Sequence, residues 1–359
     1  MKIGNKNFTT IWAEKNSVKI IDQTELPFNF KIIKLKETKD FFYAIKNMQV
    51  RGAPLIGVTA AYALAMAIKK EPSTQNILRT YKKILSARPT AVNLRWALDL
   101  LKKKVLKLNE KDRIIESFKI ADKIREDDIN NCKKIGYYGC QIIKKIFKKK
   151  KRKINILTHC NAGWLATVDW GTALAPIYAA SNNKIPIHVW VDETRPRNQG
   201  ALLTAWELKH QKIPYTIIVD NAGGHLMQTG KVDLCIVGSD RTALNGDVCN
   251  KIGTYLKALS AFDNSIPFYV ALPISTIDNT LPRGLNKINI ESRSGKELTH
   301  VNVNSKNKRK ISEIYFKNAK TYNPAFDVTP SKFITSLITD RGHVKASTRD
   351  IRKLLEQCI

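Results

Sequence analysis

The sequence lacks the features of membrane and secreted proteins. Its apolar runs all stop short of the length needed to cross a bilayer. The N-terminal stretch, MKIGNKNFTTIWAEKNS, has no apolar core of the kind that signal peptides carry. We therefore expect a soluble protein of the cytoplasm that does not bind membranes.

Cysteine is present, but without the spacing of a metal site or a disulfide framework. The six cysteines stand at positions 132, 140, 160, 235, 249 and 358, with no CxxC pair and no zinc-type spacing to a histidine. Disulfides are also disfavoured in a chain without a secretory signal. Two interpretations of Cys160, which follows an apolar run in ILTHCNAG, therefore stay open: a core side chain or a catalytic thiol.

Several common catalytic and nucleotide-binding motifs are also missing. No GxGxxG follows a strand-like run, and no GxxxxGK[ST] occurs, so dinucleotide-binding and P-loop classes lose their main support. The chain likewise has no GxSxG elbow and no HExxH helix.

Acidic residues are scarce relative to basic ones. The 31 Asp and Glu residues face 61 Lys and Arg residues, for a net charge of +30. The excess is mostly scattered lysine with one dense block, KKKKRK at 148–153, and no basic motif is interleaved with aromatics. A nucleic-acid footprint, a solvated lysine-rich surface and attraction of a phosphorylated small molecule all fit this charge. We favour the solvated surface and expect no specific nucleic-acid partner.

The first part of the chain has the apolar spacing of helices. A strand and turn are predicted at 18–26, and helix-period spacing follows at 38–48, 54–70, 74–86, 91–108 and about 112–148. At 359 residues the chain is long enough for two domains. We expect a mostly helical N-terminal domain at 1–125 and a second domain at 126–359, with the boundary inside 110–153.

After residue 153 short β-rich apolar runs alternate with helical ones. Strands are predicted at 154–158, 187–191, 215–219, 234–238 and 267–272, with helical runs between them at 171–180, 200–210 and 252–262. This βαβ series predicts an α/β fold with a parallel sheet covered by helices on both faces. The polar segment 286–312 is expected to be an excursion or loop.

Polar motifs follow four of these predicted strands. In an open parallel sheet, ligands bind beyond the carboxyl ends of the strands. One crevice is therefore expected to hold Cys160, Asp192, Glu193, Asp220 and Asp240. The alternative for each acid is a helix cap or turn residue. His159 is a poor base for Cys160, because adjacent residues at a strand end point to opposite sides.

Three predicted helix starts carry cations, as a phosphate site requires. Fixed backbone amides at a helix N-terminus bind anions, and glycine lets the backbone approach closely. Plain capping is the alternative for each start, but three together beside a crevice favour a phosphorylated ligand. The residues concerned are Arg51, Gly52, Ala53 and Pro54 in RGAPLIGV, Arg88 before Pro89 and Thr90, and Asn250 with Lys251 in NKIGTY.

These motifs resemble one known family. The chain is similar from about residue 50 to 345 to the methylthioribose-1-phosphate isomerases, which are related to ribose-1,5-bisphosphate isomerases and to regulatory subunits of initiation factor 2B. The matching motifs are RGAPLIGV, RPTAVNL, THCNAGWLATVDWGTALAPIYAA, DETRPRNQGALLTAWEL, GSDRTALNGDVCNKIGTY, PFYVALPISTID and NPAFDVTP. Of these, THCN, DETRPxxQG and GDVCNKIGTY mark the isomerases rather than the initiation factors.

The resemblance implies a fold and a reaction. It implies a helical N-terminal domain, a Rossmann-like C-terminal domain, a homodimer, and no metal or organic cofactor. The reaction converts a 5-substituted ribose 1-phosphate to the ribulose 1-phosphate, with Cys160 and Asp240 as the catalytic pair. Asp240 follows the apolar run LCIVGS, so desolvation is expected to raise its pKa. The implied phosphate and sugar contacts are Arg51, Gly52, Ala53, Arg88, Gln199, Asn250 and Lys251.

Departures from the family pattern leave the substrate open. Trp164 and His225 stand at unusual positions, and Leu202 replaces an arginine. Trp164 and His225 either reshape the pocket around the 5-substituent or lie outside it. The alternatives to methylthioribose 1-phosphate are 5-deoxyribose 1-phosphate, ribose 1,5-bisphosphate, and a non-catalytic regulatory role like that of the initiation factor.

Overall fold

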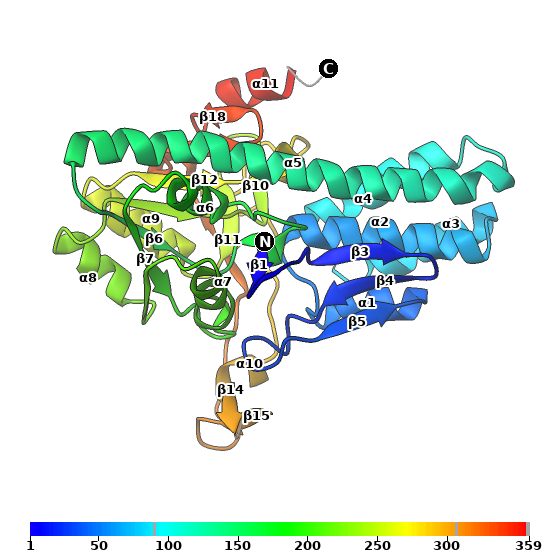
Figure 1. Ribbon diagram of the computed structural model, residues 1–359, viewed down its shortest axis with the longest axis horizontal. Helices are drawn as coiled ribbons and strands as arrows, with labels where there is room; N and C mark the ends of the chain where they lie inside the picture. The colour runs from blue at the N-terminus through cyan, green and yellow to red at the C-terminus, as the bar shows by residue number, and fades with distance from the viewer. Residues whose placement is uncertain (89–90, 306–307, 357–359) are drawn as a thin grey trace.

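A helical lobe and a sheet-based lobe lie side by side along the molecule (Figure 1). The computed structural model describes residues 1–88, 91–305 and 308–356. The α/β fold class predicted from the sequence is confirmed. The helical lobe holds α1 (Thr38–Lys46), α2 (Ala53–Lys70), α3 (Thr74–Leu85) and α4 (Val92–Val105).

The helical lobe also contains a small antiparallel sheet, most of which was not predicted from the sequence. Its order is β3 (Ile11–Glu14), β4 (Ser17–Ile21) and β5 (Ile32–Leu35), and only β4 was predicted. The missed strands have four residues each, too few to show a clear alternation of apolar and polar side chains. A separate pair, β1 (Lys2–Ile3) and β2 (Lys6–Asn7), lies at the N-terminus.

Helix α2 lies at the centre of the helical lobe. It is apolar on all sides, and nearly all of its residues are buried against neighbouring helices, as expected for a core helix. Among the described residues it is the one helix long and apolar enough to span a membrane, and most of it is buried inside the protein.

One long helix, α5 (Glu110–Lys150), runs through both lobes (Figure 1). Asn109 caps the start of the helix by accepting a hydrogen bond from the Asp112 amide. Lys151, in the left-handed conformation, caps its end. Ile124 of α5 packs into the helical core, whereas Ile135 packs into the core under the sheet. We propose that the division into domains 1–125 and 126–359 follows this change of core within the helix.

The sheet lobe is built on a mostly parallel sheet in the Rossmann order. The order is β8–β7–β6–β9–β12–β17, with β18 added antiparallel at the edge. Its strands are β6 (Ile154–Thr158), β7 (Ile187–Asp192), β8 (Tyr215–Ile218), β9 (Leu234–Val237), β12 (Phe268–Ala271), β17 (Ser336–Thr339) and β18 (Gly342–Val344). All five strands predicted after residue 153 are confirmed. The chain builds outward from β6 in one direction and then returns to start β9 on its other side.

Helices and short turns connect these strands. They are the 3-10 turns Trp164–Ala166, Ile274–Thr276 and Ser331–Phe333, the π-helical turn Gly200–Thr204, and helices α6 (Ala175–Asn182), α7 (Ala205–His210), α8 (Ala222–Gln228) and α9 (Thr254–Asp263). Helix α11 (Thr348–Glu356) follows the last strand, β18. The helical runs predicted at 171–180, 200–210 and 252–262 correspond to α6, α7 and α9.

A second, four-stranded sheet follows β9, where the sequence predicted a loop and a helix start. Its order is β13 (Ile277–Asp278), β10 (Arg241–Ala243), β11 (Val248–Lys251) and β16 (Phe326–Thr329). Asn250 and Lys251 therefore lie on strand β11, and the prediction that they open a helix is wrong. Helix α9 begins three residues after Lys251, because the left-handed Gly253 turns the chain between the two elements.

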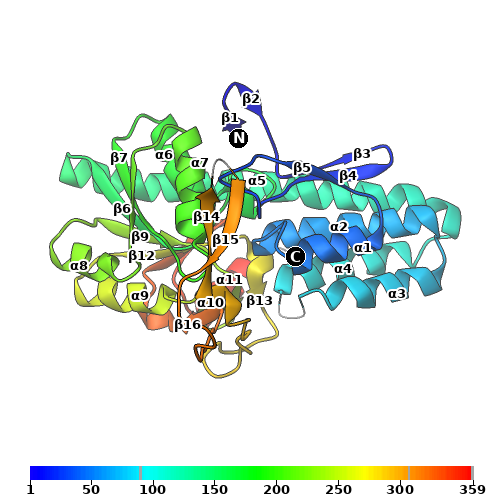
Figure 2. The ribbon, with the colours of Figure 1, turned by 90° about the horizontal axis from the view of Figure 1, so that it is seen from below.

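The polar segment 286–312 is an excursion, as predicted. It carries α10 (Lys296–Thr299) and a hairpin of β14 (His300–Ser305) and β15 (Lys308–Glu313) that stands at the junction of the lobes (Figures 1 and 2). Arg309 binds the carbonyl of Thr24 in the helical lobe, and Arg195 of the sheet lobe binds the carbonyl of Leu298. The excursion therefore contacts both lobes.

The KKKKRK block has a structural role besides solvation. It covers the end of α5 and the turn into β6. Lys150 and Arg152 both form ion pairs with Asp233, whose side chain is 1% exposed. Asp233 also accepts a hydrogen bond from the Asn155 amide, so the block ties α5 to the first strand of the sheet.

Candidate functional site

The candidate site lies where the sheet changes its direction of growth. Strands β6 and β9 are parallel neighbours, and the chain leaves them toward opposite edges. Such a switch point leaves a crevice at the carboxyl ends of the two strands. Cys160 follows β6 by two residues, and Asp240 follows β9 by three. The topology thus places both at this crevice.

Cys160 has a strained backbone and a buried thiol. Its φ of 67° lies in the left-handed region, and such outliers concentrate at functional sites. The Thr194 hydroxyl accepts a hydrogen bond from the Cys160 amide, and the Thr204 hydroxyl donates one to the Cys160 carbonyl. Its Sγ lies 3.6 Å from Oε1 of Gln199, and the residue is 9% exposed. The thiol is therefore held in one place beside the cavity.

All nine residues predicted for the site line one cavity. This cavity lies between the N-terminus of α2, the ends of β6 and β9, and strand β11. The predicted residues that line it are Arg51, Gly52, Ala53, Arg88, Cys160, Gln199, Asp240, Asn250 and Lys251. Pro89 and Thr90, which were predicted to precede the next helix, lie outside the described residues.

The prediction that Asp192, Glu193 and Asp220 share this crevice is wrong. None of the three lines the cavity as the described residues form it. Asp192 ends β7, Glu193 follows it, and Asp220 follows β8. Both strands lie on the far side of β6 from the switch point. The Asp220 carboxylate instead accepts hydrogen bonds from the Thr194 and Arg195 amides, which is the turn role left open for these acids.

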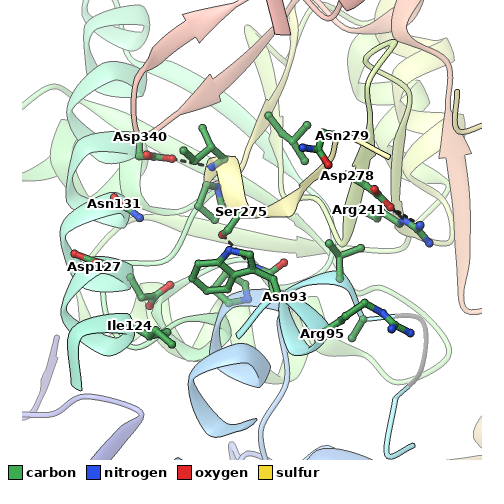
Figure 3. Close-up of a pocket in the computed structure, with 18 of the residues that line it drawn as sticks. Asn93, Arg95, Ile124, Asp127, Asn131, Arg241, Ser275, Asp278, Asn279 and Asp340 are labelled. Atoms are coloured by element: carbon green, nitrogen blue, oxygen red, sulfur yellow. Dashed lines mark hydrogen bonds and ion pairs between the residues drawn. The ribbon is translucent and has the colours of Figure 1, made fainter. Parts of the chain in front are cut away.

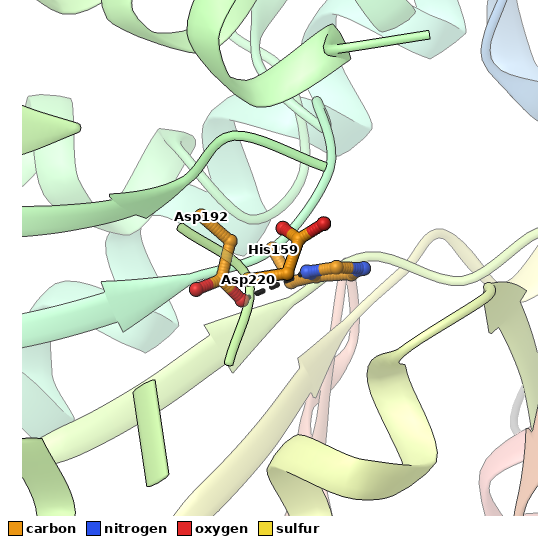
Figure 4. Close-up of side chains that lie close together, drawn as sticks. All are labelled: His159, Asp192 and Asp220. Carbon is orange, nitrogen blue, oxygen red and sulfur yellow. Dashed lines mark hydrogen bonds and ion pairs between the residues drawn. The ribbon is translucent and has the colours of Figure 1, made fainter. Parts of the chain in front are cut away.

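His159, Asp192 and Asp220 cluster closely enough to suggest metal ligands (Figure 4). Lys257, however, lies 3.4 Å from Oδ2 of Asp192 and donates to the Asp220 carbonyl, so an ammonium group already supplies positive charge there. The two ring nitrogens of His159 contact Oδ2 of Asp192 and the Ile252 carbonyl, each at 2.8 Å. His159 also lines the cavity, but both of its ring nitrogens contact groups other than Cys160, and the cluster joins the loops at the strand ends.

Buried cations give the cavity a strong positive potential. Arg51, Arg88, Lys251 and Arg293 all line it, whereas Asp240 is its one acidic lining residue in the described chain. Burial lowers the pKa of both Arg51 and Arg88, and the neighbouring Arg293 lowers that of Arg88 further. The Nε atoms of Arg51 and Arg88 are buried without a hydrogen-bond partner among the described residues. Glu291 already pairs with Arg88 and Arg293, and an anionic ligand would supply acceptors for the unpaired Nε atoms.

Lys251 is also buried inside the site. Burial, with Arg293 nearby, lowers the pKa of Lys251 to about 8. Its Nζ donates to the Ala325 carbonyl at 2.9 Å and lies 4.7 Å from the centre of the Phe326 ring. A phosphate bound beside Lys251 would favour its charged form.

The N-terminus of α2 is fitted against the loop after β6. Gly52 caps the helix with φ 85°, and a Cβ at this position would lie 2.2 Å from the Ala166 carbonyl oxygen. Only glycine permits this approach, which brings the first amides of α2 to the cavity. Pro54 stands in the first turn, as predicted.

Asp240 is only half-buried, so the desolvation expected from the preceding apolar run is incomplete. Its amide donates to the Cys249 carbonyl across the start of the second sheet. Its carboxylate makes no hydrogen bond or ion pair within the described residues. It is therefore free to act on a ligand in the cavity.

Further residues that the sequence did not single out also line the cavity. Among them are Met48, Asn161, Arg293 and Phe326. Asn161 and Phe326 stand inside the motifs THCN and NPAFD, which could have signalled them. Arg293 comes from the start of the excursion, where no sequence pattern marks it. Trp164 is fully buried beside Trp206 and His225 is exposed on α8, so both lie outside the cavity, as does Leu202.

A second, wider cleft adjoins the cavity and lies between the two lobes (Figure 3). Pro54 and Pro273 line both spaces. Asn93 of α4 donates to the Ser275 hydroxyl across this cleft, and Arg241 pairs with Asp278. The nine predicted residues do not contribute to its described lining.

The five described cysteines are free, and Cys358 lies outside the described residues.

Comparisons with known proteins place the chain within a family. Residues 49–346 match the model of the initiation factor 2 subunit family. The chain therefore belongs to this family, and its most similar relatives include proteins named methylthioribose-1-phosphate isomerase. That of Methylobacterium nodulans is 52% identical over 99% of this chain and 98% of its own length. That of Escherichia coli O45:K1 is 52% identical over 97% and 94% of the two chains.

Solved structures of the same fold bear two kinds of name. The 5-methylthioribose 1-phosphate isomerase of Pyrococcus horikoshii matches with a TM-score of 0.84 and 38% identity, over 98% of this chain and 97% of that one. The delta subunit of translation initiation factor eIF-2B from A. fulgidus matches with a TM-score of 0.80 and 35% identity, over 98% and 100%. The predicted resemblance to this family is confirmed.

Proposed function

We propose that the protein is an aldose–ketose isomerase that converts 5-methylthioribose 1-phosphate to 5-methylthioribulose 1-phosphate in methionine salvage. The observation that carries this proposal is the single cavity that gathers Cys160, Asp240 and the buried cations. The curated relatives at about 52% identity that bear the name of this enzyme support it.

Binding of the phosphate follows from the charges of the cavity. Arg51, Arg88 and Lys251 supply the positive charge, and the first amides of α2 supply N–H donors. Gln199 and Asn250 line the same cavity with side-chain amides for sugar hydroxyls. The substrate phosphate sits on the anomeric oxygen, so the ring cannot open freely in solution. The protein must hold the phosphate on C1 while the ring opens.

Asp240 is the general acid and base in this proposal. Its carboxylic acid protonates the ring oxygen as the bond between that oxygen and C1 breaks. A hydrogen then passes from C2 to C1, and the C2 hydroxyl loses its proton to give the ketone. One proton enters at the ring oxygen and one leaves from the C2 hydroxyl, so the isomerisation needs no co-reactant.

Cys160 takes part in moving the hydrogen. In a proton-transfer route its thiolate removes the C2 proton and returns a proton to C1 through an enediol-like species. In a hydride-shift route the hydrogen moves directly, and Cys160 stabilises the transition state. Both routes require the thiol at the reacting carbons, which its placement beside the cavity supports.

The experiment is NMR of methylthioribose 1-phosphate in deuterated water with wild type and Cys160→Ser. We expect the wild type to form the ketose and the variant to form at least about a hundredfold less. Deuterium at C1 of the product indicates proton transfer, and protium there indicates a hydride shift or a shielded proton. Equal turnover by the two proteins would remove Cys160 from the chemistry.

Two other sugar phosphates serve as alternative substrates in the same experiment. A 5-deoxyribose 1-phosphate fits any pocket that takes a methylthio group, since apolar pockets discriminate weakly against smaller groups. Ribose 1,5-bisphosphate requires a second cationic site. Absence of turnover on all three sugars would overturn the proposal and favour a regulatory role, in line with the likeness to the eIF-2B delta subunit.

The proposal includes a homodimer in the cytoplasm without a cofactor. These expectations rest on the family resemblance. Sedimentation of the purified protein across a concentration series tests for the homodimer. Activity that persists after exhaustive dialysis against a chelator would agree with the absence of a metal cofactor.

A further inference from the structure

A buried glutamate outside the cavity is connected to its phosphate site. Glu207 on α7 is 0% exposed and does not line the cavity. Its Oε1 accepts hydrogen bonds from Nδ2 of Asn161 at 2.8 Å and from the Leu165 amide at 3.2 Å. Its Oε2 accepts from the Trp164 amide at 2.9 Å and from the Tyr178 hydroxyl. Four donors thus hold one carboxylate that the proposed chemistry does not use.

The carboxylate has a dedicated space in the loop after β6. A Cβ on Gly163 would lie 1.8 Å from Oε2 of Glu207, so glycine is required there. Burial raises the pKa of Glu207 to about 6, against the opposing effect of its hydrogen bonds to Tyr178 and Asn161. Burying a carboxylate is unfavourable even when its hydrogen bonds are made, although an apolar side chain here would leave the Trp164 and Leu165 amides without this acceptor. A charged group kept here therefore needs a reason beyond packing.

The reason lies one residue further along the network. A carboxylate can only accept hydrogen bonds, so it fixes the side-chain amide of Asn161 with its nitrogen toward Glu207. The oxygen of that amide then accepts from one terminal nitrogen of Arg51, and the Asn161 carbonyl accepts from the other at 2.6 Å. Asn161 thus holds the guanidinium by two hydrogen bonds and leaves its Nε without a partner among the described residues.

We infer that Glu207 is a positioning residue that holds Arg51, through Asn161, in the orientation that binds the substrate phosphate. This inference rests on the proposed function, because it assigns Arg51 to the phosphate. Glu207 also binds the amides of Trp164 and Leu165 in the turn that packs against Gly52, so the same carboxylate fixes both the cation and the helix N-terminus of the phosphate site.

The test is a double-mutant cycle on substrate KM and on inorganic phosphate affinity. Glu207→Gln keeps the shape but gives the loop a donor in place of an acceptor. We expect KM and the Kd of inorganic phosphate to rise about tenfold to a hundredfold, with a smaller change in kcat. Arg51→Lys keeps the charge but loses the paired hydrogen bonds to Asn161. In that background Glu207→Gln is expected to change KM by less than about twofold, because coupled residues are not additive.

Tyr178→Phe is the matched control. It removes one donor to the same buried carboxylate and leaves Asn161 in place. It is expected to lower thermal stability while KM stays within about twofold of wild type, since the path to Arg51 is intact. A purely structural role of Glu207 would instead give parallel losses in both variants.

Each result supports or overturns the inference. An unchanged KM and phosphate Kd in folded Glu207→Gln would overturn it, as would the same loss in the wild-type and Arg51→Lys backgrounds. If Glu207→Gln does not fold, Asn161→Ala interrupts the path at its middle. Because Asn161 also lines the cavity, its phosphate Kd must rise about tenfold in the wild-type background but change little in Arg51→Lys for the inference to stand. Phosphate binding is measured without turnover, so failure of the proposed isomerase activity is seen separately.

Discussion

At the scale of single residues, the candidate chemistry depends on one carboxylate that the protein leaves free. Most acids near the site have protein partners, as Asp192 and Asp220 do. Asp240 has none for its carboxylate among the described residues, although buried cations line the same cavity. A carboxylate that is half-buried near cations and unpaired is suited to proton transfer with a bound ligand.

The substitution Asp240→Asn tests this role. The amide keeps the shape of the side chain but cannot exchange a proton, so we expect turnover to fall by about a thousandfold or more while the fold is kept. The measurement is ketose formation by NMR, with circular dichroism and the thermal midpoint as controls for folding. Turnover near the wild-type level would remove Asp240 from the acid–base role.

Sequence patterns identified the residues that carry the proposed chemistry and bind the phosphate. They did not identify other residues that line the site or fix its side chains in position. Arg51, Cys160 and Asp240 stand in motifs next to predicted strand ends or helix starts, so topology alone predicts that they meet. Arg293 reaches the cavity from the excursion, and Glu207 acts from inside a helix. Their positions depend on side-chain packing across long separations, which spacing along the chain does not encode.

At the scale of elements, the N-terminus of α2 depends on a close approach. Gly52→Ala would place a methyl group against the Ala166 carbonyl at a left-handed position. We expect the free energy of unfolding to fall by about 2–4 kcal/mol and phosphate binding to weaken, because the clash adds to the backbone strain.

Gly230→Ala is the control for that backbone strain. Gly230 also has a positive φ, but among the described residues no atom beyond its two chain neighbours lies within 4 Å of the position its Cβ would take. The free energy of unfolding of this variant should fall by only about 1 kcal/mol, and its phosphate binding should be unchanged. Urea unfolding and phosphate titration measure both variants, and equal losses of stability would show that the contact with Ala166 is unimportant.

Helix α5 carries a buried acid that makes stability depend on pH. Burial raises the pKa of Asp128 to about 7, opposed by the hydrogen bond from the Val168 amide and aided by the charge of Asp169. The folded state therefore binds the proton more tightly than the unfolded state. Its stabilising contribution is complete at low pH and is lost as pH rises through 7.

The measurement compares wild type with Asp128→Asn, which mimics the protonated acid. Glu207 and Asp327 have pKa values raised to about 6, so the difference between the two proteins isolates Asp128. Between pH 5.5 and pH 8.5 the free energy of unfolding of the wild type should fall by about 2 kcal/mol more than that of the variant. This value follows from about 1.4 kcal/mol per pKa unit. Parallel pH curves from urea unfolding would contradict the assignment.

The elements themselves were predictable to different degrees. The inner strands of the large sheet are mostly buried and read as continuous apolar runs, so β6, β7 and β9 were found within one residue of their ends. The hairpin of β10 and β11 was missed because three- and four-residue strands joined by a tight turn look like a loop in the sequence. Pairing with β16, far along the chain, stabilises it.

At the scale of the whole molecule, the charge of +30 is mostly a property of the surface. Part of it is used inside the protein, by the cations of the cavity and by Lys150 and Arg152 at Asp233. The remainder attracts anions at long range.

This surface charge predicts nonspecific attraction to RNA. Binding of a labelled single-stranded RNA, followed by fluorescence anisotropy, should fall steeply with salt and show no preference among sequences. Preferential binding of one sequence at physiological salt would contradict the solvated-surface interpretation and support a regulatory role. Substrate KM should depend on salt far less, because the cavity cations are buried and poorly screened.

The 41-residue helix α5 also affects which apolar surfaces are exposed while the chain is being synthesised on the ribosome. Its first half adds the last helix of the helical core, in which Val168 alone is translated later. Ile135, Ile142 and Ile143, however, pack into a core whose strands have not yet been translated. A finished helix with an uncovered apolar stripe is a surface that chaperones bind. We therefore expect a stage of synthesis in which the second half of α5 is exposed, before β6 and α6 cover it.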